Sequence, residues 1–145
     1  MDASAKLAML DEAPDGVALL DAVTGRLVEA NAEFLRQAGR GLDELRRIPV
    51  WQLCPPFTVE MERVRFKAVG QREAARAWEL LVLRPDGTEL PVEIRAKPIE
   101  LAGRRYVLAA SRDVSEDRSA ERMLQGELDE LRRLRRLMDD GKAGA

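Results

Sequence analysis

Histidine is absent from this 145-residue chain, and cysteine occurs once, as Cys54. Histidine is the commonest metal and haem ligand and the usual general base of hydrolases, so haem held through histidine and the Ser-His-Asp and Cys-His catalytic pairs are excluded. One cysteine excludes an intramolecular disulfide and a zinc site built from cysteines alone. We therefore expect no catalytic residues, no metal site and no enzymatic activity in this chain.

Neither a long apolar run nor an excess of one charge is present. The apolar stretches fall far short of the ~20 residues that span a membrane, and residues 1–6 lead into no apolar h-region, so we expect neither a transmembrane span nor a signal peptide. With 24 Lys and Arg against 26 Asp and Glu, the formal net charge of -2 provides no basic field for nucleic acid or anionic lipid. The arginines at 132–136 are flanked by acidic residues, which predicts a solvated helix surface. We expect a cytoplasmic protein that binds neither nucleic acid nor a membrane directly.

The length fits one compact domain with an added helix, and hydrophobic residues make up 46% of the chain, enough to build a core. Residues 3–10 place Leu7 and Leu10 on one side of a short amphipathic helix. Residues 17–20 and 27–30 have the length and apolar content of two strands joined by a turn.

Two helical segments follow these strands. Asn31 precedes residues 32–37 in the position of a helix N-cap. Apolar residues then recur at helical spacing until Gly70, at Phe57, Met61, Val64 and Ala68. Val59, Phe66 and Val69 widen that face. So broad an apolar face indicates a helix that contacts more than one surface.

After Gly70 the period of the pattern changes to two, which predicts strands at 78–83, 90–96 and 106–110. Turns are expected at 84–88, where Pro and Gly suit a hairpin, and at 98–103. Together with the first two strands, these segments predict an antiparallel sheet of five strands covered by helices on one face.

The segment from Asp113 to Asp140 has no proline and one glycine, and it carries opposite charges throughout. Its apolar residues recur at steps of four, three, three and four, at Leu124, Leu128, Leu131, Leu134 and Met138. This spacing is typical of a coiled coil with one irregularity of phase. We expect a long helix that pairs with another helix and is capped at its N-terminus by Asp113 or Ser115.

Five short motifs occur in order along residues 8–116. They are Leu-Asp-Glu-Ala-Pro-Asp-Gly-Val at 10–17, the stretch from Asp21 to Asn31, Gly-Leu-Asp-Glu-Leu at 41–45, Arg-Pro-Asp-Gly-Thr at 84–88 and Arg-Asp-Val-Ser-Glu at 112–116. In this order they resemble the PAS sensor-domain family, and the leucine-bearing helix after them resembles a PAS signalling linker.

The resemblance implies an α+β fold, namely a PAS-like five-stranded antiparallel sheet with helices on one face. We expect three parts in the chain. An N-terminal amphipathic cap helix at 1–12 is followed by a PAS domain at 13–114 and by a signalling or coiled-coil helix with its tail at 115–145.

For function, the resemblance implies a sensory or dimerisation input module of a signal-transduction protein, such as a two-component histidine kinase, a diguanylate cyclase or a transcription regulator. The module would relay a ligand-bound or conformational state to that effector through its C-terminal helix. Asp113, Val114 and Ser115 are the expected relay residues, because they join the last strand to the helix. Two alternatives stay open: a ligand-free adaptor that holds proteins together, and a flavin-binding redox or light sensor.

The candidate ligand pocket is formed by apolar and aromatic residues and one amide: Asn31, Phe34, Trp51, Phe57, Met61, Val64 and Trp78. These side chains could surround a small apolar or carboxylate ligand, a flavin, or only one another, since aromatic residues at such spacings also form plain cores. Asn31 could donate to a ligand or only cap its helix. Cys54 lacks the surrounding cysteine motif of the family's flavin-binding light sensors, so we interpret it as an inert, partly buried thiol.

A leucine stripe on a helix stays in water unless a partner covers it. We therefore predict a homodimer formed through the first helix and the exit helix. Its interface residues are Leu7, Leu10, Leu124, Leu128 and Leu131. Parallel and antiparallel pairings both fit the pattern.

Overall fold

The computed structural model describes residues 15–71 and 75–143, so the helix predicted at 3–10, with Leu7 and Leu10, lies outside the described residues. The chain divides into two compact units, Met1–Val114 and Ser115–Ala145. In order, the elements are β1 Gly16–Asp21, β2 Leu27–Ala30, α2 Ala32–Ala38, α3 Leu42–Leu45, the 3-10 turns η1 Val50–Leu53 and η2 Pro56–Thr58, α4 Val59–Gln71, β3 Arg76–Leu83, β4 Glu89–Leu101, β5 Arg104–Asp113 and α5 Ser115–Ala143.

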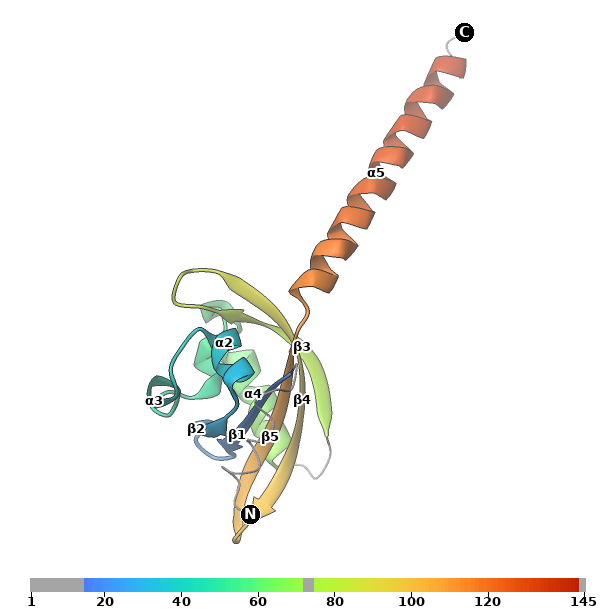
Figure 1. The fold of residues 1–145 in the computed structure, drawn as a ribbon. Helices are drawn as coiled ribbons and strands as arrows, with labels where there is room; N and C mark the ends of the chain where they lie inside the picture. Colours follow the sequence, from blue (N-terminus) through green and yellow to red (C-terminus); the bar gives the residue numbers. More distant parts are fainter. Residues whose placement is uncertain (1–14, 72–74, 144–145) are drawn as a thin grey trace. The chain divides into compact units, whose positions relative to one another are not determined.

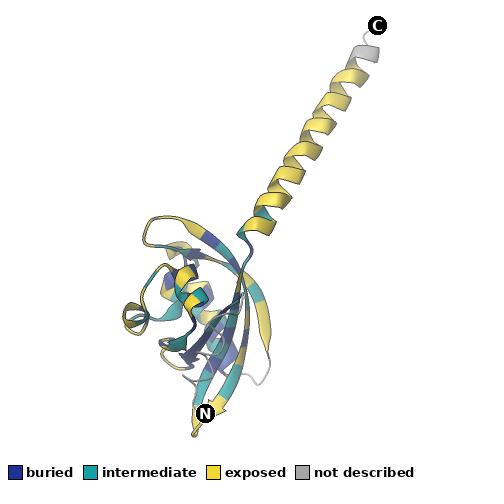
Figure 2. Ribbon diagram, viewed as in Figure 1, coloured by how far each residue is buried: buried dark blue, intermediate teal, exposed yellow. Residues whose placement is uncertain are grey.

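Five antiparallel strands form one sheet in the order β2-β1-β5-β4-β3, and the short helices of the first unit pack on one of its faces (Figure 1). Side chains alternate between the two faces of a strand, and in β4 Leu90, Val92 and Ala96 are buried whereas Glu89 and Arg95 are exposed. Buried residues gather where the helices cover the sheet (Figure 2). The predicted α+β fold with a five-stranded antiparallel sheet is confirmed.

The hairpin between β3 and β4 turns at the predicted residues 84–88. Arg84 N–H donates to the Thr88 carbonyl at 2.9 Å, and Gly87 N–H donates to the Arg84 carbonyl at 2.9 Å. Gly87 has a φ of 87°, a left-handed conformation that glycine adopts without the strain of a side chain.

The hairpin between β4 and β5 is longer than predicted. The expected turn at 98–103 is wrong in extent, because β4 continues to Leu101, which pairs directly with Arg104. Only Ala102 and Gly103 form the turn, with φ values of 53° and 78°. Two consecutive positive φ angles match the twist of the flanking strands, so this tight turn lets the ladder continue through Pro98.

Asn31 holds the first strand, the second strand and α2 together. It is fully buried, and its Oδ1 accepts from Val17 N–H at 2.8 Å and from Phe34 N–H at 3.0 Å. Its Nδ2 donates to the Asp15 carbonyl at 3.0 Å. The predicted N-cap is therefore confirmed, and the same side chain also fixes the start of β1.

The second unit is the helix α5, which begins at Ser115, the position predicted for the signalling helix, because β5 continues to Asp113. Val114 lies between them, is buried, and donates its N–H to the Pro91 carbonyl at 3.1 Å. The apolar stripe on α5, which includes Leu124, Leu128 and Leu131, is exposed in the single chain. Its pairing with another helix stays a prediction.

We expect Asn31→Ala to lower the free energy of unfolding by about 2–4 kcal/mol, because a buried N–H group of Phe34 and a part-buried one of Val17 would lose their acceptor. Urea denaturation followed by circular dichroism measures this change. Thr24→Ala is the matched control, since its hydroxyl accepts one exposed bond from Arg26 N–H. A loss no larger for Asn31→Ala than for Thr24→Ala contradicts the role given to Asn31.

Candidate functional site

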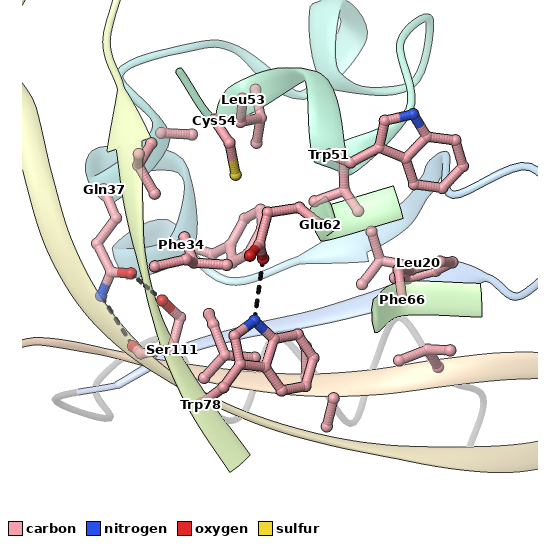
Figure 3. Close-up of a pocket in the computed structure, with 18 residues that line it drawn as sticks. Leu20, Phe34, Gln37, Trp51, Leu53, Cys54, Glu62, Phe66, Trp78 and Ser111 are labelled. Carbon is pink, nitrogen blue, oxygen red and sulfur yellow. Dashed lines mark hydrogen bonds between the residues drawn. The ribbon is translucent and has the colours of Figure 1, made fainter. Parts of the chain in front are cut away.

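A cavity of about 80 Å³ lies between the sheet and the helices that cover it. Its wall is mostly apolar and is drawn from β1, α2, η1, α4, β3, β4 and β5 (Figure 3). Three of the lining residues are alanines, Ala38, Ala96 and Ala109, and their small side chains leave part of the space open. The ring centroids of Trp51 and Phe66 lie 5.5 Å apart at the same wall.

The structure brings three of the predicted pocket residues together around this cavity, namely Phe34, Trp51 and Trp78. Asn31 is buried at the start of α2 but is not among the lining residues, and its amide makes the backbone bonds described above. Its position therefore agrees with helix capping.

The expectation that Phe57, Met61 and Val64 line the pocket needs correction. These side chains are 85%, 46% and 54% exposed and are not part of the wall. Phe57 lies in η2, before α4 begins, and the side of α4 that faces the cavity carries Glu62 and Phe66. Because apolar residues surround much of this helix, their spacing alone does not determine which face is buried.

Glu62 is an acidic side chain in this apolar wall, and the sequence pattern does not single it out. It is 4% exposed, and its two oxygens accept from Trp78 Nε1 at 3.0 Å and from Arg65 Nη1 at 2.7 Å. Figure 3 shows the bond to Trp78 at the cavity wall. A buried carboxylate needs such partners, and these two supply an indole donor and a cation.

Gln37 of α2 and Ser111 of β5 form a second polar group in the wall (Figure 3). Gln37 Nε2 donates to the Ser111 carbonyl at 2.9 Å, and the Ser111 hydroxyl donates to Gln37 Oε1 at 2.6 Å. Both side chains are buried, so these bonds fix α2 against the central strand. The two residues are 74 positions apart, and no local pattern predicts their contact.

Hydrogen bonds continue from Gln37 to the end of β5. Gln37 Nε2 also donates to Glu33 Oε2 at 2.9 Å, and Glu33 accepts two bonds from Arg36, at 2.5 and 2.8 Å. Arg36 Nη2 in turn donates to Asp113 Oδ2 at 3.0 Å. The bond from Arg36 holds the pKa of Glu33 below its usual range, and the bonds to Glu33 and Asp113 raise the pKa of Arg36. This set of side chains, Ser111, Gln37, Glu33, Arg36 and Asp113, is called the α2–β5 network below.

The size of the cavity limits what it can hold. An apolar cavity of about 150 Å³ is large enough for benzene. The cavity described here has about half that volume. The three fused rings of a flavin therefore do not fit inside it, so this conformation does not support the flavin alternative.

A family model for the PAS domain matches residues 14–116. The chain belongs to the PAS domain family. PAS domains are generally sensory rather than catalytic, and the predicted membership is confirmed.

Solved PAS structures share the fold of this PAS domain. The PAS domain of an HTR-like protein from Haloarcula marismortui is 28% identical, with a TM-score of 0.64 over 76% of this chain and 89% of that chain. A domain of the sensory box sensor histidine kinase/response regulator from Geobacter sulfurreducens is 22% identical, with a TM-score of 0.59 over 75% and 89%. The PAS domain of the Cronobacter turicensis RpfR quorum-sensing receptor, solved in complex with BDSF, is 17% identical, with a TM-score of 0.60 over 72% and 97%.

The comparison with curated proteins found no relative that matches this PAS domain. Along residues 15–71 and 75–143, no helix combines the length and apolar content needed to cross a membrane. Within the same part of the chain, no three His, Cys, Asp or Glu side chains are grouped to hold a metal ion.

Burial, and to a smaller extent the charge of Glu62, raises the pKa of the Cys54 thiol from 9.0 to about 12. The thiolate is the reactive form, so at pH 8 its fraction in the folded PAS domain is roughly a thousandth of that of a free thiol. We expect iodoacetamide to alkylate Cys54 at least about a hundred times more slowly in buffer than in urea. Mass spectrometry over time measures both rates, and equal rates would refute an inert thiol.

Proposed function

We propose that this PAS domain is a sensory input module that passes the state of its cavity to α5 through the α2–β5 network. The observation that carries the proposal is that one network joins the cavity to the end of β5. It includes two residues of the cavity wall, Gln37 and Ser111, and the last residue of β5, Asp113. Alternate residues of a strand face the same side, so Ser111 and Asp113 lie on the same face of β5.

A molecule in the cavity would act first on Gln37 and Ser111. A polar group that bonds to the Gln37 amide competes with the bonds to Ser111 and Glu33, since one amide nitrogen makes both. Weakening the bond to Glu33 lets that carboxylate move. Because Glu33 also accepts from Arg36, its movement changes how Arg36 is oriented toward Asp113. Such a ligand shifts the network between two arrangements only as far as its affinities for them differ.

Asp113, Val114 and Ser115 are proposed to carry this change into α5. The Asp113 carboxylate bonds to Arg36, and Val114 is buried and tied to the Pro91 carbonyl. Ser115 is the first residue of α5, so the backbone that the network holds is continuous with the helix. Only Val114 therefore separates a change at Asp113 from the first residue of the helix.

An effector is the proposed recipient of the signal, and the host is a cytoplasmic signal-transduction protein with a kinase, a cyclase or a transcription regulator. One similar structure is a domain of a sensor histidine kinase/response regulator, which supports this class of host. Another similar PAS domain was solved in complex with BDSF, which supports ligand binding by the fold.

A homodimer formed through α5 is part of the same proposal. Leu124, Leu128 and Leu131 expose apolar surface at coiled-coil spacing, and a second copy of the helix would cover it. Charged pairs on other positions of α5, such as Arg133 with Glu130, keep the rest of its surface solvated. Leu7 and Leu10 are proposed to extend the interface.

Gln37→Leu tests the relay, because it removes both bonds between the Gln37 side chain and Ser111 as well as the bond to Glu33. We expect hydrogen exchange in the first turns of α5 to change at least about threefold, since Glu33, which orients Arg36 toward Asp113, loses its bond from Gln37. Exchange is measured by mass spectrometry on the full chain. Gln52→Leu, the same substitution at an exposed position of η1, is the control. Wild-type exchange in α5 of Gln37→Leu would contradict the relay and favour a ligand-free adaptor.

Light scattering tests the dimer. We expect the wild-type chain at micromolar concentration to show about twice the monomer mass of 16.2 kDa. Leu128→Lys should return the mass to that of a monomer, because the charge would be buried in the interface. Glu130→Gln changes the net charge equally on another side of α5 and should leave the dimer intact. A monomeric wild type would refute the interface.

A further inference from the structure

Glu62 determines the charge of the cavity interior. Among the described residues that line the cavity it is the only charged side chain, and it is almost fully buried. Its cationic partner, Arg65, is not part of the wall and is about two-fifths exposed. A ligand inside the cavity would therefore meet a carboxylate, whereas the cation that pairs with it lies toward solvent.

The carboxylate of Glu62 can also accept further hydrogen bonds. An ionised carboxylate accepts about four hydrogen bonds and donates none. Glu62 accepts one on each oxygen, from Trp78 Nε1 and from Arg65 Nη1. A ligand that offers N–H or O–H gains an acceptor there, whereas a ligand that offers only acceptor oxygens gains no bond from Glu62.

We propose that the cavity selects small molecules that carry an N–H or O–H donor and no negative charge, with Glu62 as the residue that receives the donor. This inference rests on the proposed sensory function, because it names the ligand class of the same cavity. An anion would be buried next to a like charge, and no lysine or arginine in the described part of the wall would offset it.

Two further observations agree with this selectivity. The negative charge of Glu62 adds to the effect of burial in raising the pKa of the Cys54 thiol, so its field reaches another residue of the wall. The volume of about 80 Å³ restricts the ligand to a few carbon atoms beside its polar group. The apolar remainder of the wall suits such a short hydrocarbon body.

Three ligands with the same four-carbon chain separate the effects of charge and of donor: n-butanol, n-butylamine and n-butyrate. Each is titrated into the full wild-type chain at pH 7, and the indole N–H resonance of Trp78 is followed by NMR, because that group bonds directly to Glu62. We expect n-butanol or n-butylamine to shift the resonance saturably. The affinity for n-butyrate should be at least about tenfold weaker than that of the better donor.

Glu62→Gln removes the charge and keeps an acceptor for Trp78, so n-butyrate should bind to it within about threefold of n-butanol. Glu60→Gln is the matched control, because it makes the same change on an exposed side of α4 and should leave the wild-type order of affinities. If Glu62→Gln does not fold, the comparison of the three ligands on the wild type decides alone.

Equal binding of n-butyrate and n-butanol to the wild type would overturn the inference, and so would the absence of any saturable shift with all three ligands. Unchanged selectivity in folded Glu62→Gln would also overturn it. These outcomes concern the ligand class only. The sensory relay is judged separately by hydrogen exchange in Gln37→Leu, which needs no ligand, so the failure of one proposal is distinguishable from failure of the other.

Discussion

The buried side chain of Asn31 is the constraint on which the rest of this PAS domain depends. One amide caps α2 through Phe34 N–H, bonds to Val17 N–H in β1 and holds the Asp15 carbonyl. Gly16 makes the close approach possible, because a Cβ there would lie 2.9 Å from Phe34 Cα. With α2 seated directly on β1 in this way, Phe34 and Gln37 reach the cavity, and the remaining helices close over the sheet.

The central position of β5 then links the cavity to the end of the sheet. This strand lies between β1 and β4, and Val107, Ala109 and Ser111 contribute alternate residues to the cavity wall. Asp113 is the next residue on that face, so the two-residue period of a strand aligns the wall with the last position before the exit. Gln37 and Arg36 of α2 bond to Ser111 and Asp113 on this face, so the α2–β5 network runs along β5 toward the C-terminal end of the strand.

Local signals in the sequence predicted much of the fold, and contacts between distant residues account for what they missed. Strand alternation, the Gly87 turn and the Asn31 cap are each encoded within a few residues, and each appears in the structure. The buried face of α4 includes instead Glu62, whose carboxylate accepts there from Trp78, 16 positions later. A hydrophobic pattern discounts an acidic residue as a core position, so the sequence did not distinguish the cavity side of α4, with Glu62 and Phe66, from the exposed side with Met61 and Val64.

The three alanines of the cavity wall determine how easily mutation can fill the cavity. Ala38, Ala96 and Ala109 lie on α2, β4 and β5, and each is buried next to open space. One codon change at any of them adds carbon atoms to the interior without touching the polar groups of the wall. A few such mutations would fill the cavity, so the proposed ligand receptor and a solid scaffold lie close together in sequence on the same fold.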